Sequence, residues 1–274
     1  MSQLIKKPPE HNIRPFVLFI FVIILVLAVF SFSDVTTQEA QDGAQLAGKQ
    51  PPLASPGKQA TTTAEKRIFA VTAPRFDNIF GTDAGKVYVY EITEPYLGSR
   101  QPVAVKLRWS AEGTAADDTF GRSVDILDDV NGDGKPDIVV GAAKFGTLPL
   151  LKGDYVSVSS GANGALLWKV LGENPQFPVS QCGSYFKNDH FGQAVSSVPD
   201  ADFDGIDDVV VGAPGYHYCS FTGKIYLFSG TTGNLIWSKE GDNINDKLGW
   251  AVKGIKDLNG DGAGDIIAST DKAN

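Results

Sequence analysis

One acidic loop pattern occurs three times in the chain and constrains the fold more than any other feature. The loops span residues 129–137, 200–208 and 257–265, so they begin 71 and 57 residues apart. Each loop has an oxygen-bearing side chain at positions 1, 3, 5 and 9 and a glycine at position 6. Recurrence at this spacing indicates a repeat architecture with a unit of about sixty residues.

Fixed sequences flank each loop. Nine residues before the loops stand Phe120-Gly121, Phe191-Gly192 and Leu248-Gly249. After each loop comes a short apolar run that ends in small residues, at 138–142, 209–214 and 266–270. Apolar runs of this length, rich in Val and Ile, predict buried β-strands.

The residue types in the loops predict calcium binding. Alternating carboxylates and amides on a tight turn bring hard oxygen ligands to one point, and a backbone carbonyl at position 7 can join them. A single loop of this kind could equally be a solvated acidic turn, but three in one register favour calcium. An EF-hand would need Glu at position 12 and flanking helices. Position 12 is instead Val140, Val211 or Ala268, inside a predicted strand.

The order Phe-Gly, Asp-rich loop, Gly-Ala-Pro resembles the FG-GAP repeat of integrin α-subunit head domains and their bacterial relatives, over about residues 68–270. The resemblance implies an all-β fold of β-propeller blades, each with four antiparallel strands, with the loop joining the first and second strands. It also implies three Ca²⁺ sites. The side-chain ligands, with the position 7 carbonyls added, are Asp129, Asn131, Asp133, Lys135 and Asp137; Asp200, Asp202, Asp204, Ile206 and Asp208; and Asp257, Asn259, Asp261, Ala263 and Asp265.

The repeat boundaries predict an incomplete ring of a little over three blades within residues 67–274. We expect a partial blade at 67–112, complete blades at 118–178 and 189–240, and a partial blade at 246–274. Propellers have about four to eight blades. A truncated or split coding sequence would explain the shortfall, and self-association or a partner chain that completes the ring is the alternative. Trp109, Trp168 and Trp237 recur on the last strand of three units, which predicts packing between adjacent blades.

The N-terminal region predicts export. Residues 1–14 are a polar cytoplasmic n-region, residues 15–33 a hydrophobic helix that acts as a signal anchor or signal peptide, and residues 34–66 a flexible low-complexity stalk. Residues 16–30 contain no polar side chain. An uncleaved anchor that contacts the membrane is favoured, with cleavage near Ser33 as the alternative. Both place the rest of the chain outside the cytoplasm.

Cysteine content and net charge bear on two further properties, disulfide bonding and nucleic-acid binding. Cys182 and Cys219 are the two cysteines, and export permits a disulfide between them on the face opposite the calcium loops, with free thiols as the alternative. The net charge is −8 and ten aspartates occupy proposed ligand positions, with no basic patch that could neutralise phosphates. Nucleic-acid binding is therefore excluded as a function.

The favoured function is a cell-surface or extracellular binding or adhesion module without enzymatic activity. Its protein or glycan ligand would contact the loops at 144–154, 174–190 and 215–222. One alternative is the propeller portion of an exported polysaccharide- or phospholipid-directed hydrolase, although His190 and His217 have no recognisable Ser or Cys partner. A quinone-dependent dehydrogenase propeller is a further alternative, because residues 233–237 resemble its Trp-bearing repeat; the Asp-rich loops do not fit that pattern.

Overall fold

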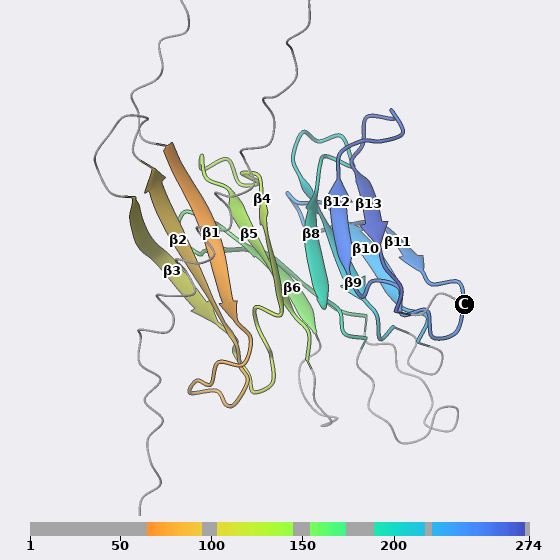
Figure 1. The fold of residues 1–274 in the computed structure, drawn as a ribbon, viewed down its shortest axis with the longest axis horizontal. Helices are drawn as coiled ribbons and strands as arrows, with labels where there is room; N and C mark the ends of the chain where they lie inside the picture. The colour runs from red at the N-terminus through yellow and green to blue at the C-terminus, as the bar shows by residue number, and fades with distance from the viewer. Residues whose placement is uncertain (1–64, 95–102, 145–153, 174–188, 217–220, 272–274) are drawn as a thin grey trace, which may run out of the picture. The chain divides into compact units, whose positions relative to one another are not determined.

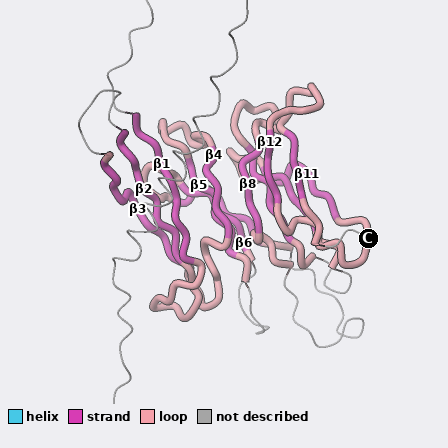
Figure 2. Tube along the Cα trace, viewed as in Figure 1, coloured by secondary structure: helices cyan, strands magenta, loops and turns pink. Residues whose placement is uncertain are grey.

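The computed structural model describes residues 65–94, 103–144, 154–173, 189–216 and 221–271. These residues form strands and loops without a helix (Figure 2), and no helix in these ranges has the length and apolar character of a membrane span. The predicted signal segment, residues 15–33, lies outside the described residues, as do Cys182 and Cys219.

The described residues contain thirteen strands, arranged in consecutive antiparallel sheets of three, four, four and two strands (Figure 1). Strands that follow one another in sequence are neighbours in each sheet, so every sheet is a simple meander. This confirms the predicted all-β fold of four-stranded blades with a partial sheet on either side. The strands are β1 (Glu65–Ala73), β2 (Lys86–Glu94) and β3 (Ala104–Glu112); β4 (Ser123–Leu127), β5 (Asp137–Ala142), β6 (Tyr155–Ser159) and β7 (Leu166–Leu171); β8 (Ala194–Val198), β9 (Asp208–Ala213), β10 (Lys224–Phe228) and β11 (Leu235–Glu240); and β12 (Val252–Ile255) and β13 (Asp265–Ala268).

The second strand of each complete sheet is buried along its whole length. Every residue of β5 and of β9 is buried, which agrees with their continuous apolar sequences. Each of these strands pairs with a neighbour on both sides and is covered by other sheets on its faces. Val140 and Val211, at loop position 12, are 2% and 0% exposed, so they are strand residues of the core and cannot serve as metal ligands.

Consecutive sheets pack against each other and enclose the hydrophobic core between them. The first strands are in contact along the series, β4 with β8 and β8 with β12. Phe191 belongs to the core cluster that also holds Val139 and Val156 of the preceding sheet. Its ring lies 5.3 Å from that of Tyr226 and 5.9 Å from that of Phe228. Phe120 lies 6.2 Å from Tyr155 in the preceding interface. The Phe of each Phe-Gly pair therefore contributes apolar area to the core.

The glycines of the repeat lie where the backbones of two sheets approach closely. A Cβ on Gly141 would lie 2.1 Å from the carbonyl oxygen of Gly192, and a Cβ on Gly212 would lie 2.1 Å from that of Gly249. Within its own sheet, Gly192 donates its N–H to the carbonyl of Gly212, at 3.1 Å. The glycine of each Phe-Gly or Leu-Gly pair therefore lies against the Gly-Ala glycine of the preceding unit, at a contact that leaves no room for a side chain.

The three tryptophans each sit beside an irregularity in the strand pairing. In the pairings β2–β3, β6–β7 and β10–β11, the last two strands of each sheet, the register shifts next to Trp109, Trp168 and Trp237. One extra residue therefore stands on the last strand of each sheet. A bulge of this kind increases the local twist and changes the direction of nearby side chains. Trp109 and Trp168 contact the following sheet, which confirms that they pack between blades.

The glycine contact between sheets predicts a specific loss of stability. Gly212→Ala should lower the free energy of unfolding by about 1–3 kcal/mol, because the added Cβ forces the backbones of two sheets apart. Urea denaturation followed by far-UV circular dichroism measures this change. Ser269 holds the equivalent place after the third loop, where a side chain is already accommodated, so Ser269→Ala is the matched control. Similar losses in the two variants would contradict this explanation.

Candidate metal centre

The three acidic loops occupy equivalent places in their sheets. They connect β4 to β5, β8 to β9, and β12 to β13, so each joins the first strand to the second, as the sequence predicts. The last loop residue is also the first residue of the second strand. The sheet therefore fixes one end of each loop, and the remaining positions form a tight turn at the strand ends.

The aspartate at position 9 ties each loop to its sheet. Its carboxylate accepts the backbone N–H of position 2 in all three loops, at 3.0, 2.7 and 2.7 Å. Asp137 and Asp208 also accept an N–H from the turn between the third and fourth strands, from Gly161 at 2.9 Å and from Gly230 at 3.0 Å. Both carboxylates are fully buried. Burial raises the pKa of Asp137 and raises the pKa of Asp208 to about 6.

The side chains at positions 3 and 5 hold the turn in shape. The oxygen at position 3 accepts the N–H of position 5 at 2.9, 3.1 and 2.8 Å, and position 5 accepts the N–H of position 7 at 3.0, 2.9 and 2.9 Å. The second oxygen of Asp133 accepts the Ser160 hydroxyl at 2.8 Å, and that of Asp204 accepts the Thr231 hydroxyl at 2.9 Å. The Ser160 hydrogen bond is the main cause that lowers the pKa of Asp133.

Position 1 distinguishes the second loop from the other two. Asp129 accepts the N–H of Gly134 at 2.5 Å, and Asp257 accepts the N–H groups of Gly260 and Gly262 at 2.7 and 2.8 Å. These hydrogen bonds lower the pKa of Asp257. In the second loop, the Oδ1 atom of Asp200 is buried without a hydrogen-bond partner. A buried carboxylate oxygen in this state is unfavourable unless a cation balances it.

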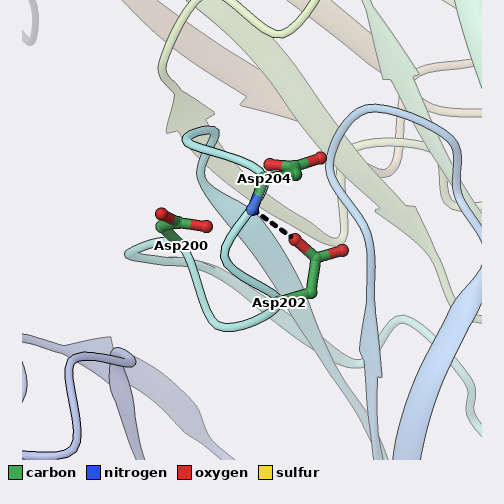
Figure 3. A group of neighbouring side chains, drawn as sticks. All are labelled: Asp200, Asp202 and Asp204. Carbon is green, nitrogen blue, oxygen red and sulfur yellow. Dashed lines mark hydrogen bonds between the residues drawn. The ribbon is translucent and has the colours of Figure 1, made fainter.

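Three carboxylates converge in the second loop (Figure 3). Asp200, Asp202 and Asp204 each offer an oxygen atom, and these atoms lie within 4.8 Å of one another. Two of the three side chains are exposed and Asp200 is half-buried. Like charges at this separation repel one another, so the loop favours a divalent cation. In the first and third loops an asparagine stands at position 3, and the oxygen set there contains two carboxylates and one amide at positions 1, 3 and 5.

The donor set of these loops suits Ca²⁺. Ca²⁺ takes six to eight oxygen ligands from carboxylates, amides and backbone carbonyls. Positions 1, 3 and 5 supply side-chain oxygens at the tip of each turn, while the position 9 carboxylate already accepts backbone N–H groups. The structure thus brings the predicted residues of each loop onto one turn, and their coordination of a metal stays a prediction.

A second set of aspartates, at the opposite ends of the first strands, was not anticipated from the sequence. Asp118, Asp189 and Asp246 stand two residues before each Phe-Gly or Leu-Gly pair and are 0%, 3% and 7% exposed. Their carboxylates accept backbone N–H groups of the connecting segments, at 2.9 Å from Thr114 and at 2.8 Å from Asn243. The recurring Asp-x-(Phe/Leu)-Gly pattern could have revealed them. Their role is to order the connections between blades.

The predicted ligand-binding loops are described only at their edges, since 145–153, 174–188 and 217–220, with His217, lie outside the described residues. At one edge, the Lys224 ammonium lies 2.9 Å from Glu173 Oε1 and 4.6 Å from the ring centres of Tyr216 and Tyr226. Burial raises the pKa of Tyr216 to about 12. His190 is half-buried, and burial lowers its pKa.

The different surroundings of the position 9 carboxylates predict unequal effects of substitution. In calcium-free buffer, Asp137→Ala should cost roughly 1–3 kcal/mol of stability, because it leaves buried N–H groups without an acceptor. Asp265→Ala should cost less, since Asp265 is half-buried. Urea denaturation of both variants with a chelator measures the difference. An equal or larger loss of stability for Asp265→Ala would show that the turn at Gly161, which donates to Asp137, does not stabilise the loop.

Comparison with known proteins agrees with this architecture. The family model for the FG-GAP repeat matches residues 120–161 and 191–228, which hold the first and second loops. Integrin alpha-4 of Xenopus laevis is 26% identical over 189 residues, covering 66% of this chain and 16% of the integrin. Integrin alpha-6 of Gallus gallus is 29% identical over 179 residues, covering 61% of this chain and 15% of the integrin. The chain thus spans about a sixth of the length of these relatives.

Among solved structures, a rhamnogalacturonan lyase of Bacillus licheniformis aligns with a TM-score of 0.40 and 17% identity, over 78% of this chain and 43% of that chain. The family-model match covers β4 to β6 and β8 to β10, with the first two acidic loops, the two Phe-Gly pairs and the buried strands β5 and β9. The chain therefore contains FG-GAP repeats at residues 120–161 and 191–228.

Proposed function

We propose that this chain is an exported calcium-binding module that recognises a protein or glycan ligand at the cell surface or outside the cell. The observation that carries the proposal is the second loop, where three carboxylates converge and a buried oxygen of Asp200 has no hydrogen-bond partner. The equivalent loops repeat the same turn with the same backbone hydrogen bonds. Three Ca²⁺ sites are proposed, one at each loop.

Calcium would act as a structural cross-link in these loops. When bound, it supplies positive charge that offsets the repulsion between carboxylates. Hydrogen bonds within the protein then hold the loop in shape. Asp208 anchors the end of the loop by accepting the Gly230 N–H, and the Thr231 hydroxyl orients the Asp204 carboxylate. A rigid loop end in turn fixes the start of β9, which lies in the core.

We propose that the ligand binds at the other ends of the strands, away from the metal loops. The segments there are the longest connections between strands and include Tyr216 and the Lys224 and Glu173 pair. The similarity to integrin α subunits supports a binding role over catalysis. The apolar run at residues 16–30 supports export and membrane anchoring, and export would allow a disulfide between Cys182 and Cys219.

Calcium stoichiometry tests the metal sites. Equilibrium dialysis of the full chain against ⁴⁵Ca²⁺, over a concentration series that extends well above Kd, should saturate at three bound ions per chain, with affinities of about 10⁻⁴ to 10⁻³ M, as is typical of extracellular sites. Asp202→Ala removes a ligand from the second loop and should reduce the number to two. Saturating calcium should also raise Tm, since binding at 100 times Kd contributes about 2.7 kcal/mol per site.

An exposed carboxylate outside the loops provides the control. The Asp242 side chain is 77% exposed and pairs with Lys239 on the surface, so Asp242→Asn changes the charge without touching a loop. This variant should still bind three ions. Equal loss of bound calcium in Asp202→Ala and Asp242→Asn would mean that the ions are held by general acidity. No binding by the unmodified chain would refute the proposed sites altogether.

A further inference from the structure

Position 4 of the second acidic loop departs from the other two loops. It is Phe203, whereas the first and third loops have Gly132 and Gly260 there. All three residues have a positive φ, which is 66° at Phe203, 77° at Gly132 and 83° at Gly260. This backbone conformation is ordinary for glycine but unfavourable for a bulky aromatic residue. Backbone strain of this kind concentrates at functional positions.

The Phe203 side chain leaves its own loop and lies beside the third loop. It is 66% exposed, so burial in the core does not hold it in place. Its ring atom Cε1 lies 3.4 Å from the position that a Cβ on Gly262 would take. Gly262 is position 6 of the third loop, and its N–H donates to the Asp257 carboxylate at 2.8 Å. The ring therefore lies against the residue that holds a proposed calcium ligand of the third loop in place.

A backbone hydrogen bond joins the same two loops at a second point. The Gly264 N–H donates to the carbonyl of Pro199 at 2.8 Å. Gly264 is position 8 of the third loop, and Pro199 directly precedes Asp200, which is position 1 of the second loop. A Cβ on Gly264 would lie 2.2 Å from this carbonyl oxygen, so the two backbones are in direct contact. The Phe203 ring thus lies beside a loop whose place relative to its own loop is fixed.

The first and second loops provide a contrast. Position 4 of the first loop is Gly132, which has no side chain that could reach the second loop. A Cβ on Gly205, at position 6 of the second loop, would meet nothing within 4 Å in the described part of the chain, whereas a Cβ on the equivalent Gly262 would meet Phe203. Among the described residues, the side-chain contact between loop tips therefore joins the second loop to the third, and not the first to the second.

A calcium ion in the second loop would fix the place of this ring. Phe203 stands between Asp202 and Asp204, two of the three carboxylates that converge there (Figure 3). Their repulsion opposes a closed turn, and one ion bound to both would fix the backbone between them. The ring would then hold the turn in which Gly262 donates to Asp257. When one ion orders residues that the next ion also needs in order, the second ion binds more tightly.

We propose that Phe203 couples calcium binding at the second and third loops, so that an ion in either loop raises the affinity of the other. The proposal rests on the proposed calcium sites and adds to them a positioning residue that binds no ion itself. The coupling is reciprocal, because the free energy of binding both ions does not depend on their order. The first loop binds its ion independently.

Two-site variants of the full chain test the coupling. Asp129→Ala removes the first site and leaves the second and third, while Asp257→Ala removes the third site and leaves the first and second. Equilibrium dialysis against ⁴⁵Ca²⁺ gives the Hill coefficient of each variant, which cannot exceed 1 for two independent sites. We expect about 1.4 for Asp129→Ala, which corresponds to about fivefold coupling. For Asp257→Ala we expect a coefficient no greater than that of independent sites.

Phe203→Gly then identifies the residue responsible. It gives the second loop the residue that the other two loops have at position 4, so the turn keeps its shape. Combined with Asp129→Ala, it should remove the cooperativity while two ions still bind. Combined with Asp257→Ala, it is the matched control, because it reports any change in the affinity of the second site itself.

The outcomes separate the coupling from the calcium sites. Two bound ions without cooperativity in Asp129→Ala would overturn the coupling and leave the sites standing. Cooperativity that persists when Phe203→Gly is added, or cooperativity in Asp257→Ala, would overturn the assignment to Phe203. A lack of bound calcium in the unmodified chain would refute the sites and the coupling together.

Discussion

The close backbone approach between consecutive sheets is the constraint on which the rest of the structure depends. Gly141 meets Gly192, and Gly212 meets Gly249. At each contact the carbonyl oxygen of the second glycine lies 2.1 Å from the position that a Cβ on the first would take. This contact sets the distance between sheets, and that distance in turn lets Phe191 fill the core between them and lets Trp168 reach the carbonyl of Gly230. Glycine is therefore required wherever two sheets meet in this way, because the contact leaves no room for a side chain.

The acidic loops build on this frame. A loop on a sheet edge would be free to change shape, but the position 9 carboxylate binds it from two sides: to the start of its own turn and to the glycine turn of its own fourth strand. That same glycine turn is the surface on which the tryptophan of the preceding sheet lies. Loop shape, sheet packing and the tryptophan contact are thus three consequences of one short turn.

Much of this architecture could be predicted from the sequence, because the acidic loop, the Phe-Gly pair and the tryptophan each recur along the chain. Three loops in one register predicted the repeat, the resemblance to the FG-GAP repeat implied the place of each loop between two strands, and the recurring tryptophans predicted the packing between sheets that Trp109 and Trp168 make. The buried Asp118, Asp189 and Asp246 were not predicted, although the pattern Asp-x-(Phe/Leu)-Gly occurs three times, because an isolated aspartate in a connecting segment has the same residue type as a solvated turn residue. The unequal hydrogen bonding of Asp200, Asp129 and Asp257 depends on local backbone angles, such as the φ of 23° at Asp200, which residue types do not determine.

If the repeated loops are calcium sites held in place by the sheets, crystals grown in calcium and measured at a wavelength where calcium scatters anomalously will show it. We expect anomalous peaks at all three loops, each about 2.3–2.6 Å from the oxygens of positions 1, 3 and 5 and from the carbonyl of position 7. Loops of the same shape that hold water, with no anomalous peak at Asp200, Asp202 and Asp204, would contradict it.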